Sequence, residues 1–201
     1  MSSPVGHILG ALALHRSLGS RTPADAPAGA KGVLLVAALA LAPDLDLVWG
    51  WRYGDGTLWH RGFTHSVVFA AGLALLGNIV WYHSFRALTA LRSMLALFAV
   101  CLVHPLLDFL MGRPGVALLA PFRGGRWFSP VQLVPTAYYP RRFGHIAGLL
   151  ADAYVLRGMF LELCIFLPLL VAAKPGQGLP LRLAMLLISA GSLTATVCLY
   201  N

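Results

Sequence analysis

The stretch VLLVAALALAPDLDLVWGW, residues 33–51, is a long apolar run that is interrupted near its end by Pro43, Asp44 and Asp46. A transmembrane helix needs about 20 consecutive, mainly apolar residues. Proline perturbs a helix, and carboxylates in an apolar segment are costly unless they have a purpose. The stretch therefore predicts a membrane crossing that ends in two carboxylates at one membrane face.

The composition of the whole chain agrees with a membrane protein. Its 201 residues are 58% hydrophobic and 11% charged, with a mean hydropathy of +0.75, which is too apolar for an ordinary soluble domain. We expect one membrane-embedded domain over residues 1–201, an all-α bundle of about five or six transmembrane helices. The net charge of +8 is scattered through short loops without a Lys/Arg block, which favours membrane lipid headgroups and argues against nucleic acid.

Further apolar segments flank the first one along the chain. The stretch 5–18 is barely long enough to span and contains His7, so it is either re-entrant or partly inside the bundle. The stretch 112–144 is rich in Gly, Pro, Arg and aromatic residues and predicts an interfacial loop. The remaining predicted helices cover 64–82, 91–111, 145–173 and 181–200.

Ionisable residues in the apolar segments fall into short clusters, and the connectivity places these clusters on one membrane face. Asp44 and Asp46 end a helix that arrives at this face, and His60 and His65 begin the helix that leaves it. The next helix returns to the same face with the pair His104 and Asp108, and His7 joins them if the first stretch spans from that face. A lone intramembrane His or Asp is usually a satisfied helix contact, but convergence of several favours a shared site.

The residue types in these clusters suit a metal ion. His104 and Asp108 are four apart, so they share one helical face. Imidazoles mixed with carboxylates favour zinc, manganese or iron over calcium, and their number allows one or two ions. We predict a divalent metal, zinc or alternatively manganese, with these ligands: His7, Asp44, Asp46, His60, His65, His104 and Asp108.

Other residues near the clusters are candidates for catalysis and substrate binding. Asp46 or Glu162 are candidates to take a proton from a metal-activated water, and Arg61 to balance charge on a phosphoryl or acyl oxygen. We predict that Ser66, Arg123 and Arg126, together with Arg61, contact the substrate. The alternative for Glu162 is an ion pair inside the fifth apolar segment, for example with Arg157.

These motifs resemble a known family. Gly6-His7, the run PDLD at 43–46, the heptapeptide HRGFTHS at 60–66 and the run HPLLD at 104–108 are similar to the YdjM-like family, described as LexA-binding, inner-membrane-associated, metal-dependent hydrolases. The resemblance covers about residues 4–130, and the heptapeptide is its most specific part. It implies a multi-pass protein of the bacterial inner membrane and metal-dependent hydrolysis.

The order of the clusters also resembles the ligand pattern of zinc-dependent phospholipase C, which implies a lipid or phosphoester substrate. That pattern continues with a later HxxxE pair, whereas Gly158 stands four residues before Glu162 in this chain. The resemblance therefore does not supply a complete three-zinc site.

Three functions are consistent with the sequence. The first is a membrane-bound hydrolase that acts on a lipid or lipid-linked ester at the membrane surface. The second is a metal or ion transporter, which needs ligands near the membrane midplane. The third is a non-enzymatic anchoring or regulatory protein. The concentration of ligands towards one face favours the hydrolase, and the sequence leaves the oligomeric state open.

Overall fold

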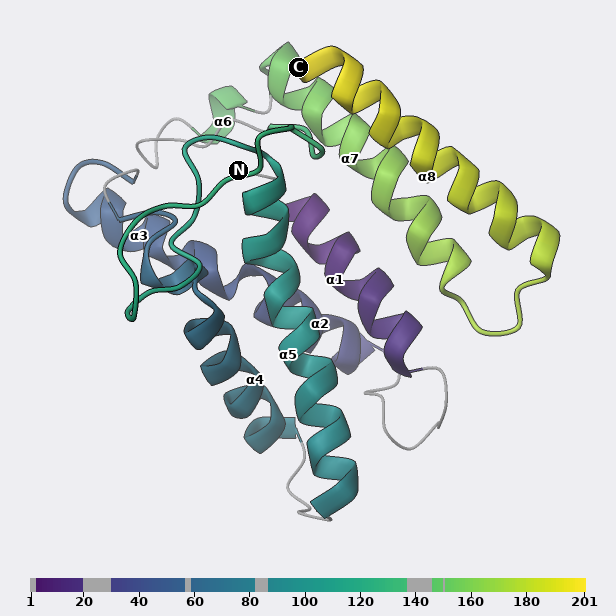
Figure 1. The fold of residues 1–201 in the computed structure, drawn as a ribbon, viewed down its shortest axis with the longest axis horizontal. Helices are drawn as coiled ribbons and strands as arrows, with labels where there is room; N and C mark the ends of the chain where they lie inside the picture. The colour runs from purple at the N-terminus through teal and green to yellow at the C-terminus, as the bar shows by residue number, and fades with distance from the viewer. Residues whose placement is uncertain (1–2, 20–29, 57–58, 82–86, 137–145, 150) are drawn as a thin grey trace.

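The computed structural model describes residues 3–19, 30–56, 59–81, 87–136, 146–149 and 151–201 (Figure 1). Within these ranges the regular structure is helical, and the extended pairing is an isolated antiparallel bridge between Val116 and Trp127. The prediction of an all-α transmembrane bundle is confirmed. In chain order the elements are α1 (Pro4–Gly19), α2 (Ala30–Leu41), η1 (Ala42–Asp44), α3 (Leu45–Arg52), η2 (Phe63–His65), α4 (Val67–Trp81), α5 (Ala87–Leu110), α6 (Ile146–Leu149), α7 (Ala153–Ala172) and α8 (Leu179–Tyr200).

Four segments of the described chain are long and apolar enough to cross a membrane. They are Ala30–Arg52, Ser93–Leu110, Ala153–Ala172 and Leu179–Tyr200, and the apolar helix α4 is shorter. The helices turn large apolar side chains outwards, such as Leu34 and Leu187, which are 67% and 72% exposed. An apolar outer surface of this kind matches lipid rather than water.

Helix α1 lies inside the bundle, between α5 and α7 in Figure 1. Ala11, Leu12 and Ala13 are buried in a core cluster with Val36 of α2 and Val100 of α5. At 16 residues, about 24 Å, α1 is not among the segments long enough to span. Of the two predictions for the first apolar stretch, a position inside the bundle is the one that the structure shows.

Two predicted helix boundaries were wrong because side chains cap the helices elsewhere. The predicted single helix 145–173 is divided, and α7 begins after Asp152, whose carboxylate accepts hydrogen bonds from two backbone amides of the first turn. The helix predicted to start at Thr64 begins three residues later, at the position where Ser66 Oγ accepts a hydrogen bond from the amide of Phe69.

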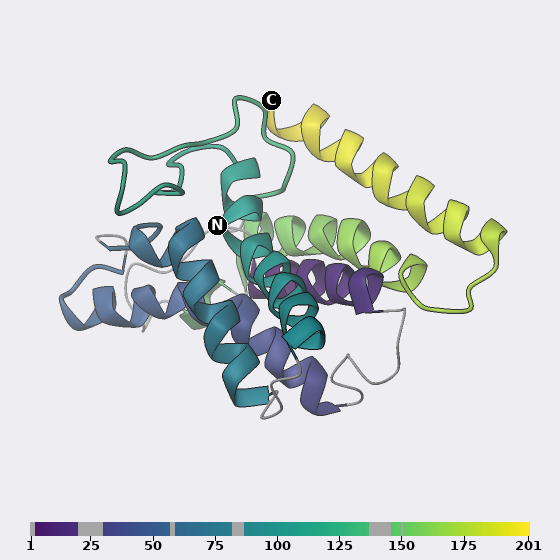
Figure 2. The same cartoon turned by 60° about the horizontal axis from the view of Figure 1, so that its bottom comes forward.

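A long non-helical segment follows α5 and lies over one end of the bundle (Figure 2). It is attached to the 60–67 region by hydrogen bonds from the Ala117 amide to the Arg61 carbonyl and from the Val67 amide to the Leu118 carbonyl. In its described part, 112–136, it matches the predicted interfacial loop, whereas 137–144 lies outside the described residues.

Candidate metal centre

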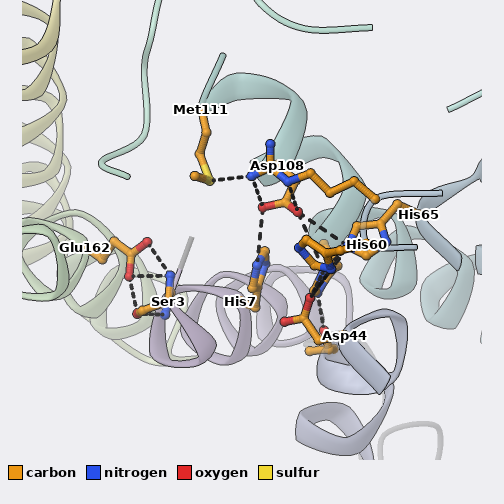
Figure 3. Close-up of polar contacts among 12 residues, drawn as sticks. Ser3, His7, Asp44, His60, His65, Asp108, Met111 and Glu162 are labelled. Carbon is orange, nitrogen blue, oxygen red and sulfur yellow. Dashed lines mark hydrogen bonds and ion pairs between the residues drawn. The ribbon is translucent and has the colours of Figure 1, made fainter. Parts of the chain in front are cut away.

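Four separate parts of the fold bring the predicted ligands together beneath this loop (Figure 3). The regular helix α2 ends at Leu41, and a short 3-10 turn that contains Pro43 follows it. This turn directs the Asp44 carboxylate into the bundle. In α5, His104 and Asp108 lie six and two residues before the helix end, about 9 Å and 3 Å along the helix axis. The contributing residues are His7 of α1, Asp44 of η1, His60 and His65 around η2, and His104 and Asp108 of α5.

Asp44 faces three imidazoles. Its Oδ1 lies 3.3 Å from His104 Nε2, 3.6 Å from His65 Nε2 and 3.9 Å from His60 Nδ1. Neither carboxylate oxygen of Asp44 makes a hydrogen bond within the described part of the chain. A buried carboxylate in this state requires a positive charge nearby.

The tautomer of His104 follows from its backbone contact. His104 Nδ1 lies 2.6 Å from the carbonyl oxygen of Ala40. A carbonyl can only accept, so Nδ1 carries the hydrogen and the lone pair of the neutral ring is on Nε2. Metal-binding histidines are commonly oriented by such a backbone contact.

His65 is oriented in the same way by a side chain. Thr64 donates its hydroxyl hydrogen to Asp46 Oδ2 at 2.6 Å, so its oxygen is available to accept from His65 Nδ1 at 3.0 Å. The other ring nitrogen, Nε2, then faces His104 Nε2 at 3.1 Å and Asp108 Oδ2 at 3.4 Å. Electron pairs therefore converge from two imidazoles and two carboxylates.

This convergence requires a cation or a proton. Burial lowers the pKa of His65, but contacts with Asp108, Asp44 and Asp46 outweigh burial and raise that pKa from 6.5 to about 10. Without a metal ion, a proton on His65 thus supplies the missing positive charge. A divalent ion would supply it more completely, because it can accept electron pairs from several ligands at once.

The spacing of the donor atoms fits a metal ion. Two ligands of a tetrahedral zinc ion, each about 2.0–2.1 Å from the metal, lie about 3.3–3.4 Å apart. The separations around Asp44 and His65 bracket this value, from 3.1 to 3.6 Å. Three overlapping groups have donor atoms within 4.8 Å of one another: His7, Asp44 and His104; Asp44, His60 and His65; and His65, His104 and Asp108.

Asp46 lies behind the imidazoles and is not part of these three groups. Its Oδ1 accepts from His60 Nδ1 at 2.8 Å, and its Oδ2 lies 3.4 Å from His65 Nδ1. Burial lowers the pKa of His60 below 6.5, so its ring is neutral with the hydrogen on the nitrogen that faces Asp46. In this geometry Asp46 orients two histidines through contacts with their Nδ1 atoms.

His7 completes the cluster from α1. Its ring stacks on that of His104, with centroids 3.7 Å apart and planes 13° apart, and its Nε2 lies 3.7 Å from Asp108 Oδ1. Neither ring nitrogen makes a hydrogen bond among the described residues, although the ring is fully buried. A buried imidazole whose two nitrogens make no hydrogen bond is suited to binding a metal ion.

Arg61 forms a fully buried ion pair with Asp108. Its Nη2 donates to Oδ1 and its Nε lies near Oδ2, both at 3.2 Å, and both side chains are 0% exposed. The backbone of Arg61 has φ +63°, a conformation that costs energy for a residue with a Cβ and often marks functional sites. The guanidinium contacts Asp108 through Nη2 and Nε, and its third nitrogen, Nη1, makes no hydrogen bond within the described residues.

The other predicted substrate contacts have structural partners. Ser66 caps α4, as described above, and is buried. Arg126 is exposed and donates from Nη2 to the His60 carbonyl at 3.0 Å, which attaches the loop above the cluster. Arg123 is exposed and lies over the ring of Trp127, 5.3 Å from its centroid. Both arginines lie on the loop that covers the site.

Glu162 lies apart from the metal-competent groups, as Figure 3 shows. Its carboxylate accepts from the backbone amide of Ser3 at 2.8 and 3.1 Å and from the Ser3 hydroxyl. Ser3 Oγ in turn accepts from the Gly6 amide at 3.2 Å and caps α1. Glu162 therefore fixes the start of the helix that carries His7.

Sequence reasoning missed two residues that support the cluster, Thr64 and Ser3. Each had a local signal. Thr64 stands beside His65 in the heptapeptide at 60–66, and Ser3 stands three residues before Gly6 at the start of an apolar helix, which is an N-cap position. Their partners, Asp46 and Glu162, are 18 and 159 residues away in sequence, so only the tertiary structure shows them.

Comparison with known proteins agrees with the predicted resemblance. A region of 116 residues is 38% identical to the inner membrane protein YbcI of Escherichia coli (strain K12); the match spans 53% of this chain and 66% of that protein. No solved structure matches the chain. The YdjM inner membrane protein family matches residues 1–194. With its four segments able to span a membrane, the chain is a multi-pass inner-membrane protein that belongs to the YdjM inner membrane protein family.

Proposed function

We propose that this protein binds one or two divalent ions in its buried His/Asp cluster and uses them to hydrolyse a lipid or lipid-linked ester or phosphoester. The observation that carries the proposal is the convergence of electron pairs on one point within the bundle. The donors are the Nε2 atoms of His65 and His104, Oδ1 of Asp44 and Oδ2 of Asp108.

The donor set indicates the metal. Imidazole nitrogens with carboxylate oxygens, and no thiolate, suit zinc and also manganese. An ion of this kind would lower the pKa of a bound water to about 7, which supplies a nucleophile for hydrolysis at neutral pH. Any two of the three donor groups have one residue in common, which is Asp44, His65 or His104. Two ions in the cluster would therefore be close neighbours.

The surrounding residues have distinct roles in this proposal. Asp46 accepts from Nδ1 of His60 and lies 3.4 Å from Nδ1 of His65, which leaves the lone pair of each neutral ring on Nε2. Arg61 balances Asp108 and has one nitrogen left to stabilise negative charge on a reacting oxygen. The Asp44 side chain is 12% exposed, whereas those of the four histidines and Asp108 are at 0%, so substrate reaches the cluster from the Asp44 side.

The burial of the cluster also supports a second candidate, an ion transporter. His104 lies about 9 Å inside the end of α5, and its side chain is 0% exposed. Such depth suits an ion that is passed between the two sides of a membrane. Uptake of zinc or manganese into vesicles that contain the purified protein would support transport, and hydrolysis without uptake would support the enzyme.

Metal content is the first test. We expect one or two zinc or manganese ions per chain in the purified protein, and a loss of at least one ion in both His65→Ala and His104→Ala. His15→Ala is the matched control, because His15 lies on α1 outside the cluster and should leave the metal content unchanged. Full metal content in both cluster variants would contradict the metal centre.

Activity is the second test, and it is separate from the first. Phospholipids and lipid-linked phosphates are incubated with the metal-loaded protein, and we expect one of these classes to be hydrolysed. The activity should disappear with a chelator and with His65→Ala, and persist in His15→Ala. If the protein binds metal but hydrolyses none of these lipids, the proposed metal centre is supported and the proposed hydrolase activity is contradicted.

A further inference from the structure

A groove of about 670 Å³ lies between α1, α7 and the first half of α8. Its walls are small and apolar side chains, including Ala13, Phe166 and Ala172, and its rim carries Ser17 and Arg182. The volume is within the range of about 300–1,000 Å³ that is typical of ligand sites. The groove follows α1 from Gly10 to Ser17, about 10 Å along the helix axis.

The groove exists because α8 packs unevenly on the bundle. Ser189, at the middle of α8, and Thr196, in its second half, are buried, and Leu193 packs against the core cluster around Phe166. In the first half, Arg182 and Leu186 are exposed and line the groove instead. Only 11% of the apolar window of α8 is buried, so this helix meets the surrounding lipid over most of its surface.

The charge at the groove is positive and has no carboxylate beside it in the described part of the chain. Arg16, at the end of α1, and Lys174, in the turn after α7, are exposed near the same end of the bundle as Arg182. The described carboxylates lie towards the other end: Asp44, Asp46 and Asp108 in the cluster, Glu162 beside Ser3, Asp152 at the start of α7 and Asp55 after α3. A counter-ion for Arg182 must therefore come from outside these residues.

We infer that the groove binds one phospholipid with an anionic headgroup, whose acyl chain fills the apolar walls and whose phosphate contacts Arg182. In an inner-membrane protein the bilayer supplies both parts of this ligand. Acyl chains match the apolar walls without leaving a polar group unpaired, and a guanidinium binds phosphate with two parallel hydrogen bonds. The groove and the metal cluster have no lining residue in common. The inference of a lipid site is therefore tested independently of the proposed hydrolysis.

Native mass spectrometry of the detergent-purified full chain tests the inference, with phosphatidylglycerol, phosphatidylcholine or inorganic phosphate added. We expect one phosphatidylglycerol per chain to be retained in preference to phosphatidylcholine. Arg182→Gln should weaken phosphatidylglycerol retention about fivefold, which is the contribution of one basic residue at an anionic membrane surface. Lys174→Gln is the matched control, because Lys174 is exposed at the same end but does not line the groove.

A second pair of variants tests the apolar part of the groove. Ala172→Leu places a larger side chain in the groove and should reduce retention of both lipids, whereas Leu187→Phe, on the exposed face of α8, should not. Equal phosphatidylglycerol retention in Arg182→Gln and the unmodified protein would overturn the inference. So would retention of inorganic phosphate in place of lipid, or a dimer that Ala172→Leu converts to a monomer, because a second copy would then occupy the groove.

Discussion

Replacing Arg61 by methionine tests whether Asp108 faces a metal ion. The two side chains form two contacts of 3.2 Å, and both are fully buried. Removal of one partner from a buried ion pair costs about 3–5 kcal/mol, because the other charge stays buried without compensation. In the metal-free protein we therefore expect Arg61→Met to lower the free energy of unfolding by about 3–5 kcal/mol.

A bound metal ion should reverse part of this loss. A ligand at about 100 times its Kd stabilises the folded state by about 2.7 kcal/mol, and the gain should be larger in Arg61→Met because no guanidinium then competes for Asp108. The assay is equilibrium unfolding in mixed micelles, with EDTA or with excess zinc. Arg157→Met is the control: this guanidinium is exposed over the Tyr200 ring, so its loss should cost less than about 1 kcal/mol in both buffers.

Two results would refute this reasoning. If Arg61→Met loses the same stability with EDTA and with zinc, Asp108 does not contact the metal. If the loss in EDTA is below about 1 kcal/mol, the ion pair is not buried as the structure shows.

Four further predictions follow from the geometry. Because the pKa of His65 is raised to about 10, a metal ion must displace the proton of His65 in order to bind. Metal affinity measured by chelator competition should therefore rise about tenfold per pH unit from about pH 7 to 9. A metal affinity that does not change over this pH range would contradict the prediction. The same shift stabilises the metal-free protein below about pH 6.5, and this stability should be lost as pH rises towards 10 in thermal unfolding scans. Gly115→Ala should destabilise the covering loop by about 1–3 kcal/mol, because φ is +81° and a Cβ would lie 2.8 Å from a backbone oxygen. The measurement is the Tm in thermal unfolding. The control Gly124→Ala, where a Cβ meets open space, should lower the Tm less. Ser3→Ala should cost about 1 kcal/mol in equilibrium unfolding through loss of the α1 cap, and an unchanged stability would show that the contact with Glu162 does not hold α1.

The sequence by itself determined the membrane class and the shared position of the clusters. Apolar runs of about 20 residues require a lipid environment, and that property is local, so residues 33–51 could be read without a structure. The connectivity of successive crossings then placed Asp44, His65 and His104 at one end of the bundle. The structure brings their side chains within 3.1–3.6 Å of one another.

Only the tertiary structure decided what each polar residue does there. Asp44 and Asp46 are two residues apart and look equivalent in sequence, yet one faces the Nε2 atoms and the other accepts from Nδ1 of His60. Glu162 was a candidate for catalysis, and its place beside Ser3 depends on how α7 packs against α1. Hydrophobic periodicity specifies which segments are helices, but the pairing of buried polar groups depends on helix packing between residues far apart in sequence, and local spacing does not encode it.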